Sequence, residues 1–428
     1  MTSLIVIILR LRFPALLLCT LLLSACASSP QTASTIPEGD FRDRIQTQEN
    51  EGIRVSAGVP SAKESQKLFG QPLYKRGIQP VWLRIENMRD VPVTFLPVGL
   101  DAKYFTPLEV ANYGTADKKP PKDLVDQYFL DQSISLIIPP GEELSGFIFS
   151  KLDEGTKTFN VDIAGSGVEG FVTFTFFIPV PGLNIDHYSV DWGKLYPADQ
   201  IVEVDDQQII ELVEEFVCCV TDKDGENYGD PLNLLLIGKP LDIYTAFIRA
   251  GWDETEAIDK SSMWKTVKSF MSGAEYRYSP ISSLYVFGRP QDVAFQKARE
   301  NIHERNHLRL WMTRGRYQGY PIWIGQISRD IGVRFTSKTI TTHKIDPNVD
   351  EAREFLLENL AYAQSLKKVG YLKGVGAVPM DQPKGNLTGD PWFSDGYRLV
   401  LWVTSEPTHL DDLEALPWRN PYLEHQDP

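Results

Sequence analysis

Cysteine is scarce in this sequence, with four residues in 428, so a disulfide framework of the kind that staples small secreted domains is excluded. Past the N-terminal region no stretch of about 20 residues is apolar and uncharged, and no transmembrane helix is expected there. Positive charge is also in deficit, because 43 Lys and Arg stand against 57 Asp and Glu, for a formal charge of −14. This balance argues against nucleic acid as a partner and against electrostatic docking onto anionic lipid.

Motifs that mark several enzyme classes are also missing. The chain has no Gly-x-Ser-x-Gly nucleophile elbow, no phosphate-binding Walker loop and no glycine pattern of a dinucleotide site. No cysteine spacing suits zinc, and no repeat of about 20–50 residues is present. We therefore expect no cofactor and no metal ion.

The N-terminus, in contrast, carries a clear pattern. Arg10 and Arg12 precede an apolar run, residues 13–25, that ends in small residues. A charged segment, a short apolar segment and a small-residue cleavage point define a secretory signal. The run is too short for a transmembrane helix, which needs about 20 apolar residues. We expect residues 1–25 to be removed as a signal peptide.

The residues Leu23, Ser24, Ala25 and Cys26 resemble the bacterial lipobox. The resemblance implies that the thiol of Cys26 receives diacylglycerol and that the new amine is acylated. Two acyl chains hold a protein on a bilayer stably, at about 0.8 kcal/mol per buried methylene. Ala27 rather than Asp follows, which by the same resemblance favours the outer membrane. We expect a periplasm-facing outer-membrane lipoprotein held by its N-terminal lipid; an ordinary signal peptide with an unrelated cysteine is the alternative.

Composition and periodicity divide the remaining chain into five segments. We expect a lipidated flexible tether over residues 26–50, a β-sandwich domain over 51–195, a linker helix within 196–226, an α+β domain over 227–405 and a tail over 406–428. Short alternating strands such as residues 81–87, separated by turn residues, favour an all-β immunoglobulin-like sandwich in the first domain. The apolar fraction of 42% supports folded cores rather than disorder.

The second domain mixes helix and strand patterns. Strands are predicted at 232–238, 284–288, 307–313, 320–328 and 397–403, and helices at 241–250, 263–271, 291–303 and 347–368. With a hairpin turn at 314–319, this order indicates an α+β domain with a mainly antiparallel sheet. Helical periodicity over 205–220 includes Cys218 and Cys219, which we interpret as two buried small apolar residues; a vicinal disulfide or a reactive thiol is the alternative.

A polar row on the predicted strand 307–313 is the first candidate site. The apolar set on this strand is Leu308, Leu310 and Met312, and the opposite set is His307, Arg309 and Trp311. Gln326, Ser328 and Asp330 form a comparable row on the next strand. If the two strands pair as a hairpin, both polar rows lie on the same side. The sequence leaves open whether this is a solvated face with one salt bridge or a polar pocket with acid–base capacity.

Residues 303–307 read His-Glu-Arg-Asn-His and match the zincin string His-Glu-x-x-His. That chemistry needs both histidines on one face of a single helix. His307 instead begins a strand pattern, so we expect no zincin site.

A second candidate site lies around residues 341–353. Asp346 is predicted to cap a helix that begins at the next residue, and Arg353 stands one turn after an aspartate. An exposed ion pair at that spacing contributes only about 0.2–0.5 kcal/mol. Capping explains neither His343 nor the position of Arg353, so both remain candidates together with Asp346.

Several ordered motifs give the second domain a family resemblance. They lie at residues 230–238, 250–252, 284–292, 307–311, 328–332 and 342–353. On these residues the domain resembles the LssY-like C-terminal domain, which is found attached to membrane proteins of the DedA and lipid-phosphatase types. The resemblance implies no established activity, and it hints at envelope lipids.

Two function classes follow. In the first, the second domain is a binding or scaffold module in the periplasm, with an envelope lipid or an unknown protein as partner. In the second, it is a hydrolase acting on an anionic envelope lipid or another phosphate-bearing substrate. The hydrolase would use His307 or His343 as the acid–base group, Asp330 or Asp346 as its orienting partner or a metal ligand, and Arg309 or Arg353 as the clamp for the anionic group.

Lipidation is directly testable. Cells that express the protein should incorporate labelled palmitate into it, and Cys26→Ala should abolish the incorporation because the acceptor thiol is lost. Cys19→Ala, a substitution inside the predicted signal, is the matched control and should leave the label unchanged. A labelled Cys26→Ala protein would show that the lipid is attached elsewhere.

Overall fold

The computed structural model describes residues 39–113, 121–165, 171–183, 190–255, 281–298, 305–334, 342–416 and 418. The predicted signal peptide, Cys26 and the helix predicted at 263–271 lie outside these ranges. All the described residues belong to one of the two units into which the chain divides. Within the described ranges, no helix is both long and apolar enough to cross a membrane.

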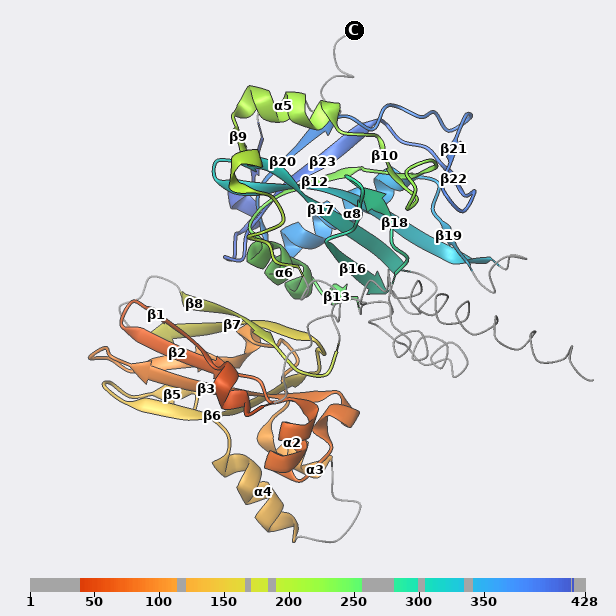
Figure 1. Ribbon diagram of the computed structural model, residues 1–428. Coiled ribbons are helices and arrows are strands. Elements are labelled where there is room, and N and C mark those ends of the chain that lie inside the picture. Colours follow the sequence, from red (N-terminus) through yellow and green to blue (C-terminus); the bar gives the residue numbers. More distant parts are fainter. Residues whose placement is uncertain are drawn as a thin grey trace, which may run out of the picture. The chain divides into compact units, whose positions relative to one another are not determined.

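Two antiparallel sheets of four strands each form the first half of the described chain (Figure 1). One has the order β1 (Gln46–Asn50), β2 (Ile53–Gly58), β3 (Ile78–Asn87) and β6 (Glu143–Lys151). The other has the order β5 (Ile137–Ile138), β4 (Val93–Leu96), β7 (Thr156–Gly165) and β8 (Phe171–Pro179). Burial alternates along much of β3 and β7, as expected where one face of each sheet packs inward.

The inward faces of these sheets share one apolar core, to which β3 contributes Val81 and β7 contributes Val161. Burial of such a side chain contributes about 1.5–3 kcal/mol relative to exposure. The prediction of two packed β-sheets is confirmed, and the immunoglobulin-like strand order stays a prediction. The predicted tether over residues 26–50 is wrong for its last ten residues, because Phe41 is 2% exposed and β1 pairs with β2.

Three short helices pack against β6 on the other face of its sheet. They are α2 (Ala62–Phe69), α3 (Pro107–Asn112) and α4 (Lys122–Asp131), with 3-10 turns at Phe41–Arg44, Leu73–Arg76 and Pro97–Gly99. α2 begins with a capping box, in which Ser61 and Glu64 each bond the other's backbone N–H. Phe69, Phe129 and Phe149 pack together between these helices and the sheet.

The segment between the two halves is a helix flanked by short strands. α5 (Asp206–Glu215) lies between β9 (Val202–Val204) and β10 (Cys219–Thr221), and a 3-10 turn at Ala198–Gln200 precedes them. The helix ends earlier than the predicted 205–220, because Arg398 binds the backbone carbonyls at its C-terminal end. Cys218 and Cys219 therefore lie past the helix and form a disulfide, so their interpretation as helical apolar residues is wrong.

A mixed sheet of ten strands dominates the second half of the described chain (Figure 1). Eight of them follow the order β13 (Asp253–Glu254), β16 (Val293–Ala298), β17 (Arg305–Tyr317), β18 (Tyr320–Arg334), β12 (Leu234–Ile237), β23 (Tyr397–Val403), β20 (Leu366–Lys373) and β24 (Glu414–Ala415). β19 (Thr342–Ile345) pairs with β18, and β9 pairs with β17. Most neighbours are antiparallel, as predicted, but β12–β23, β20–β24 and β9–β17 are parallel.

Helices cover both faces of this sheet. α6 (Pro240–Arg249) and α8 (Val349–Tyr362) pack on one face, where Phe247 and Leu356 join Leu310 in one apolar cluster. α5 packs on the other face, where Ile209 joins Trp311. α5 and α6 lie on opposite sides of the sheet in Figure 1. Residues 305–313 of β17 are accordingly buried whichever face they point to.

Two smaller sheets complete the second half of the described chain. One has the order β11 (Tyr228–Pro231), β10, β14 (Tyr285–Val286) and β15 (Arg289–Pro290), and in the other β21 (Lys384–Gly385) pairs with β22 (Pro391–Trp392). A last 3-10 turn lies at Leu410–Asp412. Parts of the predicted linker and tail belong to this fold, because β9 pairs with β17 and β24 pairs with β20.

The helix predicted over 291–303 is wrong as far as residue 298. Residues 293–298 form β16, in which Val293 pairs with Leu310 and Phe295 pairs with Leu308. Phe295 is fully buried, and its ring stacks on Phe247 with 4.7 Å between centroids. Strand pairing and core packing thus outweigh a weak local preference for helix.

The long helix predicted over 347–368 is shorter at both ends. The N-cap residue of α8 is Asn348 rather than Asp346, and the helix stops before Gln364, which takes a left-handed φ of 56°. The residues of the predicted last turn belong to β20 instead. Gly370 lies within that strand, where a Cβ would come within 2.8 Å of Leu416.

The backbone of Ile134 passes so close to Gly146 of β6 that no side chain fits there. A Cβ on Gly146 would lie 2.4 Å from the backbone nitrogen of Ile134. Gly146→Ala should therefore lower the free energy of unfolding by about 1–3 kcal/mol in urea denaturation. Gly385→Ala is the control, because a Cβ there would have no neighbour within 4 Å. Equal losses of stability in the two variants would contradict this explanation.

Candidate functional site

The hairpin of β17 and β18 brings two polar rows together. Its turn is tight, because Gln318 and Gly319 both take positive φ values, 50° and 78°, as a type I′ turn requires. The turn is therefore shorter than the predicted 314–319. The register pairs His307 with Ser328 and Arg309 with Gln326. Both polar rows share one side of the hairpin, as predicted.

This polar side of the hairpin is buried rather than solvated. His307 is 7% exposed, Arg309 8% and Asp330 3%. β11 lies against β18 and contributes Asp230, while the Ser282 carbonyl accepts a hydrogen bond from Arg309 Nε at 3.2 Å. The alternative of a solvated face is wrong, and the polar groups here need partners inside the protein.

His307 and Asp330 form a buried pair at the centre of this region. His307 Nε2 lies 2.6 Å from Asp330 Oδ2. Desolvation lowers the pKa of His307 to about 4 despite the opposing charge of Asp330, and two nearby arginines add to the shift. The ring is therefore neutral at pH 7. With the carboxylate ionised, Nε2–H donates to Asp330 and Nδ1 is the acceptor nitrogen.

Two arginines of β17 flank the pair. Arg305 Nη1 donates to Gln296 Oε1 at 2.7 Å, and Arg309 Nη1 donates to Gln326 Oε1 at 2.9 Å. Desolvation lowers the pKa of Arg309 to about 10, although two carboxylates oppose the shift. Arg309 therefore stays charged at pH 7 while almost wholly removed from water, a state that requires hydrogen-bond partners.

One buried donor in this region has no acceptor among the described residues. Gln326 is fully buried, and because its Oε1 faces Arg309, its Nε2 points elsewhere and makes no hydrogen bond. A buried donor without an acceptor costs about 1–3 kcal/mol, so Gln326 Nε2 calls for a functional explanation or a further molecule. Arg309 bonds through Nε and Nη1, and its Nη2 has no acceptor among the described residues.

Asp230 adds a carboxyl group from β11. Asn386 Nδ2 donates to its Oδ1 at 3.0 Å. Desolvation raises the pKa of Asp230, and neighbouring carboxylates add to the shift, while Asn386 and Arg309 oppose it. Asp230 therefore takes up a proton at a higher pH than an exposed aspartate does. We use "the β17–β18 polar cluster" for Arg305, His307, Arg309, Gln326, Asp330 and Asp230.

No described contact brings His343 or Asp346 into the β17–β18 polar cluster. Asp346 Oδ1 accepts a hydrogen bond from the backbone N–H of Asn348 at 3.0 Å, so it caps the turn that leads into α8. His343 lies in β19, where its backbone pairs with Val333, and its side chain is outside the described part of the chain. The catalytic or binding role predicted for these two residues stays a prediction.

Arg353 belongs to a separate buried network on α8. Its guanidinium donates to the carboxylates of Asp350, Glu354 and Asp395 and to the Tyr397 carbonyl, at 2.5–3.1 Å. Burial alone lowers the pKa of Arg353, but the three carboxylates outweigh it and raise the pKa overall. Arg353 thus joins α8 to the segment before β23, and an anionic ligand would first have to displace a carboxylate.

The zincin string does not form the helix that its chemistry needs. His307 lies in β17, a strand, and His303 is outside the described residues. In the ranges that the structure describes, no three side chains of His, Cys, Asp or Glu converge as metal ligands would. Zincin chemistry needs both histidines on one helix, and His307 is in a strand, so this string is not a zincin site.

Sequence reasoning missed three members of this region. Arg305 shares the strand parity of His307 and Arg309, and the same alternation could have revealed it. Gln296 could not be found from strand alternation, because its segment was predicted to be a helix rather than a strand. Asp230 could not be found in this way either, since the packing of β11 on β18 is a tertiary contact between distant segments.

The β17–β18 polar cluster lies in a recognised family domain. The family model described as LssY C-terminus matches residues 211–397, from within α5 to the start of β23. The chain therefore contains an LssY C-terminal domain, whose function is unknown. The match starts earlier than the predicted 227, in agreement with the packing of α5 on the large sheet. A search of the curated proteins finds no match to this chain.

His307 should make stability depend on pH. Its pKa falls from 6.5 to about 4 on folding, so between these values the unfolded chain binds the proton more tightly. The stability contributed by neutral His307 is complete above pH 6.5 and is lost as the pH falls toward 4, by about 3 kcal/mol in total. His307→Gln retains a donor for Asp330 but does not titrate. Its unfolding free energy should therefore fall less steeply with acidification than that of the wild type.

Urea denaturation between about pH 7 and pH 4 measures this difference. His409→Gln removes an exposed histidine and is the matched control. Its stability should follow the wild type across the whole range. Parallel curves for the wild type and His307→Gln would mean that His307 does not hold a depressed pKa.

Proposed function

We propose that this chain is a lipid-anchored envelope protein whose LssY C-terminal domain binds an anionic oxygen group, such as a phosphate or a carboxylate. The observation that carries the proposal is Nε2 of Gln326, a buried donor that has no acceptor among the described residues, beside the charged guanidinium of Arg309. Folding has already removed this Gln326 donor from water. A ligand oxygen that reaches it therefore gains a hydrogen bond with little further desolvation of the protein.

The charges around this donor favour an anion. Arg309 keeps its charge at pH 7, His307 is neutral, and Asp330 is engaged with His307 at 2.6 Å. Asp230, whose pKa is raised, can take up a proton when an anion arrives and can then donate a hydrogen bond to it. The β17–β18 polar cluster can therefore accommodate one added negative charge.

A hydrolase is the second candidate, and the contact between His307 and Asp330 is the observation that favours it. A histidine oriented by a buried carboxylate is the arrangement of a general base. However, with a pKa of about 4, roughly one ring in a thousand is protonated at pH 7, so His307 is a poor general acid there. A base with so low a pKa is also weak. Binding is therefore the better-supported function.

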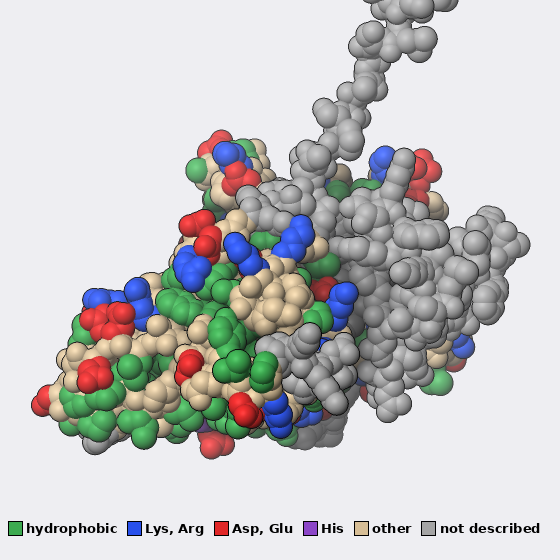
Figure 2. Space-filling view, turned by 90° about the horizontal axis from the view of Figure 1, so that it is seen from below, with side chains coloured by type: hydrophobic (Ala, Val, Ile, Leu, Met, Phe, Trp, Pro, Cys, Tyr) green, Lys and Arg blue, Asp and Glu red, His purple; other side chains and the backbone are tan. Residues whose placement is uncertain are grey.

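Membrane attachment in this proposal depends on an acylated Cys26 rather than on charge. The chain carries a formal charge of −14. Figure 2 shows Lys and Arg side chains interspersed with Asp and Glu on the described surface that faces the viewer, without a continuous basic patch there. Such a surface attracts an anionic bilayer weakly. The β-rich first half then serves as a spacer that carries the binding domain into the periplasm from the outer membrane.

Titration with simple anions tests the binding proposal. Calorimetric titration of the full-length protein in mild detergent with inorganic phosphate, and separately with acetate, should detect binding to the wild type. Gln326→Glu should weaken this binding by at least about tenfold, because its own carboxylate pairs with Arg309 and takes the place of the ligand. The thermal midpoint of the variant should not fall, since the internal ion pair replaces the lost contact.

Gln382→Glu introduces the same charge at an exposed position and is the matched control. It should bind both anions like the wild type. Equal affinities of the wild type and Gln326→Glu would place the anion elsewhere, and a wild type that binds neither anion would overturn the proposal. Hydrolysis of an aryl phosphate ester that disappears in His307→Gln would favour the hydrolase instead.

A further inference from the structure

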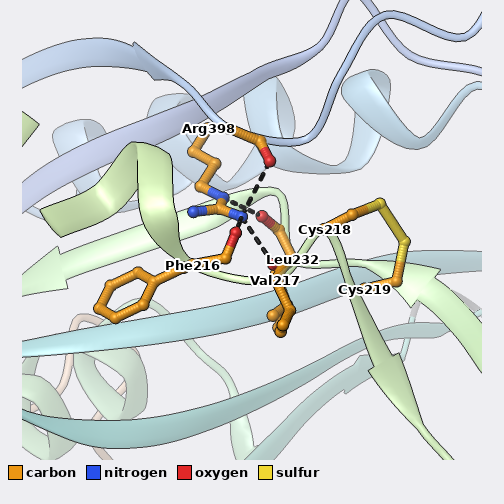
Figure 3. Close-up of a disulfide and its surroundings, with 7 residues drawn as sticks. Phe216, Val217, Cys218, Cys219, Leu232 and Arg398 are labelled. Carbon is orange, nitrogen blue, oxygen red and sulfur yellow. Dashed lines mark hydrogen bonds between the residues drawn. A yellow bond between two sulfur atoms is a disulfide. The ribbon is translucent and has the colours of Figure 1, made fainter. Parts of the chain in front are cut away.

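Cys218 and Cys219 form a vicinal disulfide at the start of β10, just after α5 (Figure 3). A disulfide stabilises a fold mainly by constraining the unfolded chain, and the effect grows with the length of the loop that it closes. These two cysteines are adjacent in sequence, so the bond encloses no intervening residue. Loop closure in the unfolded chain therefore explains little of why this disulfide is present.

The backbone beside the pair is also held without the disulfide. Arg398 Nη2 donates to the carbonyl oxygens of Phe216 at 3.1 Å and Val217 at 2.8 Å (Figure 3). The backbone N–H of Leu232 donates to the Cys218 carbonyl at 2.8 Å. Arg398 is fully buried, and the partners of its other hydrogen bonds are backbone carbonyls as well. The two sulfur atoms are thus carried by a fixed backbone whether or not they are bonded to each other.

The two cysteines differ in access. Cys219 is 5% exposed and packs in an apolar cluster with Val349 and Trp392. Cys218 packs against the same cluster but keeps part of its surface exposed. We therefore expect a thiolate from solvent to attack the sulfur of Cys218, with Cys219 as the leaving group.

We propose that the Cys218–Cys219 disulfide is a thiol–disulfide exchange site that accepts two electrons from a dithiol. One thiolate of the partner attacks Cys218 Sγ, which forms a mixed disulfide and releases Cys219 as a thiolate. The second thiolate of the partner then attacks the partner's own sulfur in the mixed disulfide and releases the Cys218 thiolate. The partner's two thiols become a disulfide, and their protons pass through water to the two cysteines, which end as thiols.

Adjacency selects a dithiol over a single thiol. After the first attack, the Cys219 thiolate lies next to the mixed disulfide, where it re-forms the vicinal bond and expels a monothiol. A dithiol overcomes this reversal, because its second thiolate competes from within the same molecule. The partner is therefore a protein or small molecule with two neighbouring thiols. This inference is independent of anion binding at the β17–β18 polar cluster.

Reduction of the folded full-length protein tests the proposal. Dithiothreitol and 2-mercaptoethanol are compared at equal thiol concentration, followed by rapid alkylation and mass analysis of the peptide that carries both cysteines. Dithiothreitol should produce doubly alkylated peptide, and 2-mercaptoethanol at least about tenfold less of it. Circular dichroism should stay unchanged, since Arg398 holds the backbone in both states. Alkylation that requires denaturant, or two thiols that no oxidant joins, would overturn the proposal.

Single-cysteine variants test the direction of attack. Cys219→Ser leaves the accessible Cys218 thiol, and Cys218→Ser leaves the buried Cys219 thiol. The first should react with dithionitrobenzoate at least about tenfold faster than the second, with both folds checked by circular dichroism. The N-terminal cysteines are common to both variants, so their contribution cancels in the comparison. Equal rates would show that access does not direct the exchange to Cys218.

Discussion

Burial of the large sheet on both faces is the constraint on which the second half of this protein depends. α6 and α8 close one face and α5 closes the other, so the polar side chains of residues 305–313 on β17 are buried. Each must find a partner inside the protein, because an unpaired buried charge is costly. The contact of His307 with Asp330, that of Arg309 with Gln326, and the carbonyls around Arg398 are three responses to this one requirement.

Local patterns predicted the features that local physics decides. Side chains alternate strictly along a strand, so residues 307–313 revealed that His307 and Arg309 share one side, and the same rule revealed the two-sheet core of the first half. Alternation could not show that this polar side is buried, because the elements that cover it come from other parts of the chain. For the same reason nothing in the sequence connected Asp230 with Arg309.

The wrong predictions lie where distant contacts outweigh local preference. Residues 293–298 are a strand because Phe295 pairs with Leu308 and stacks on a helix residue, which no window of neighbouring residues encodes. The last turn predicted for α8 is absent, because its residues belong to β20 and pair with β23. α5 stops where its carbonyls meet Arg398, and this end places Cys218 and Cys219 outside any helix.

Arg398 also imposes an order in time. Its carbonyl partners on Leu232 and at the end of α5 lie 166 to 185 residues earlier in the chain. During synthesis, those carbonyls emerge long before their donor exists. β12 likewise pairs in parallel with β23, a strand that is synthesised much later. Pairing between strands so far apart in sequence is slow. The large sheet can close only when nearly the whole chain has been made, an architecture that suits a polypeptide kept unfolded until its synthesis is complete.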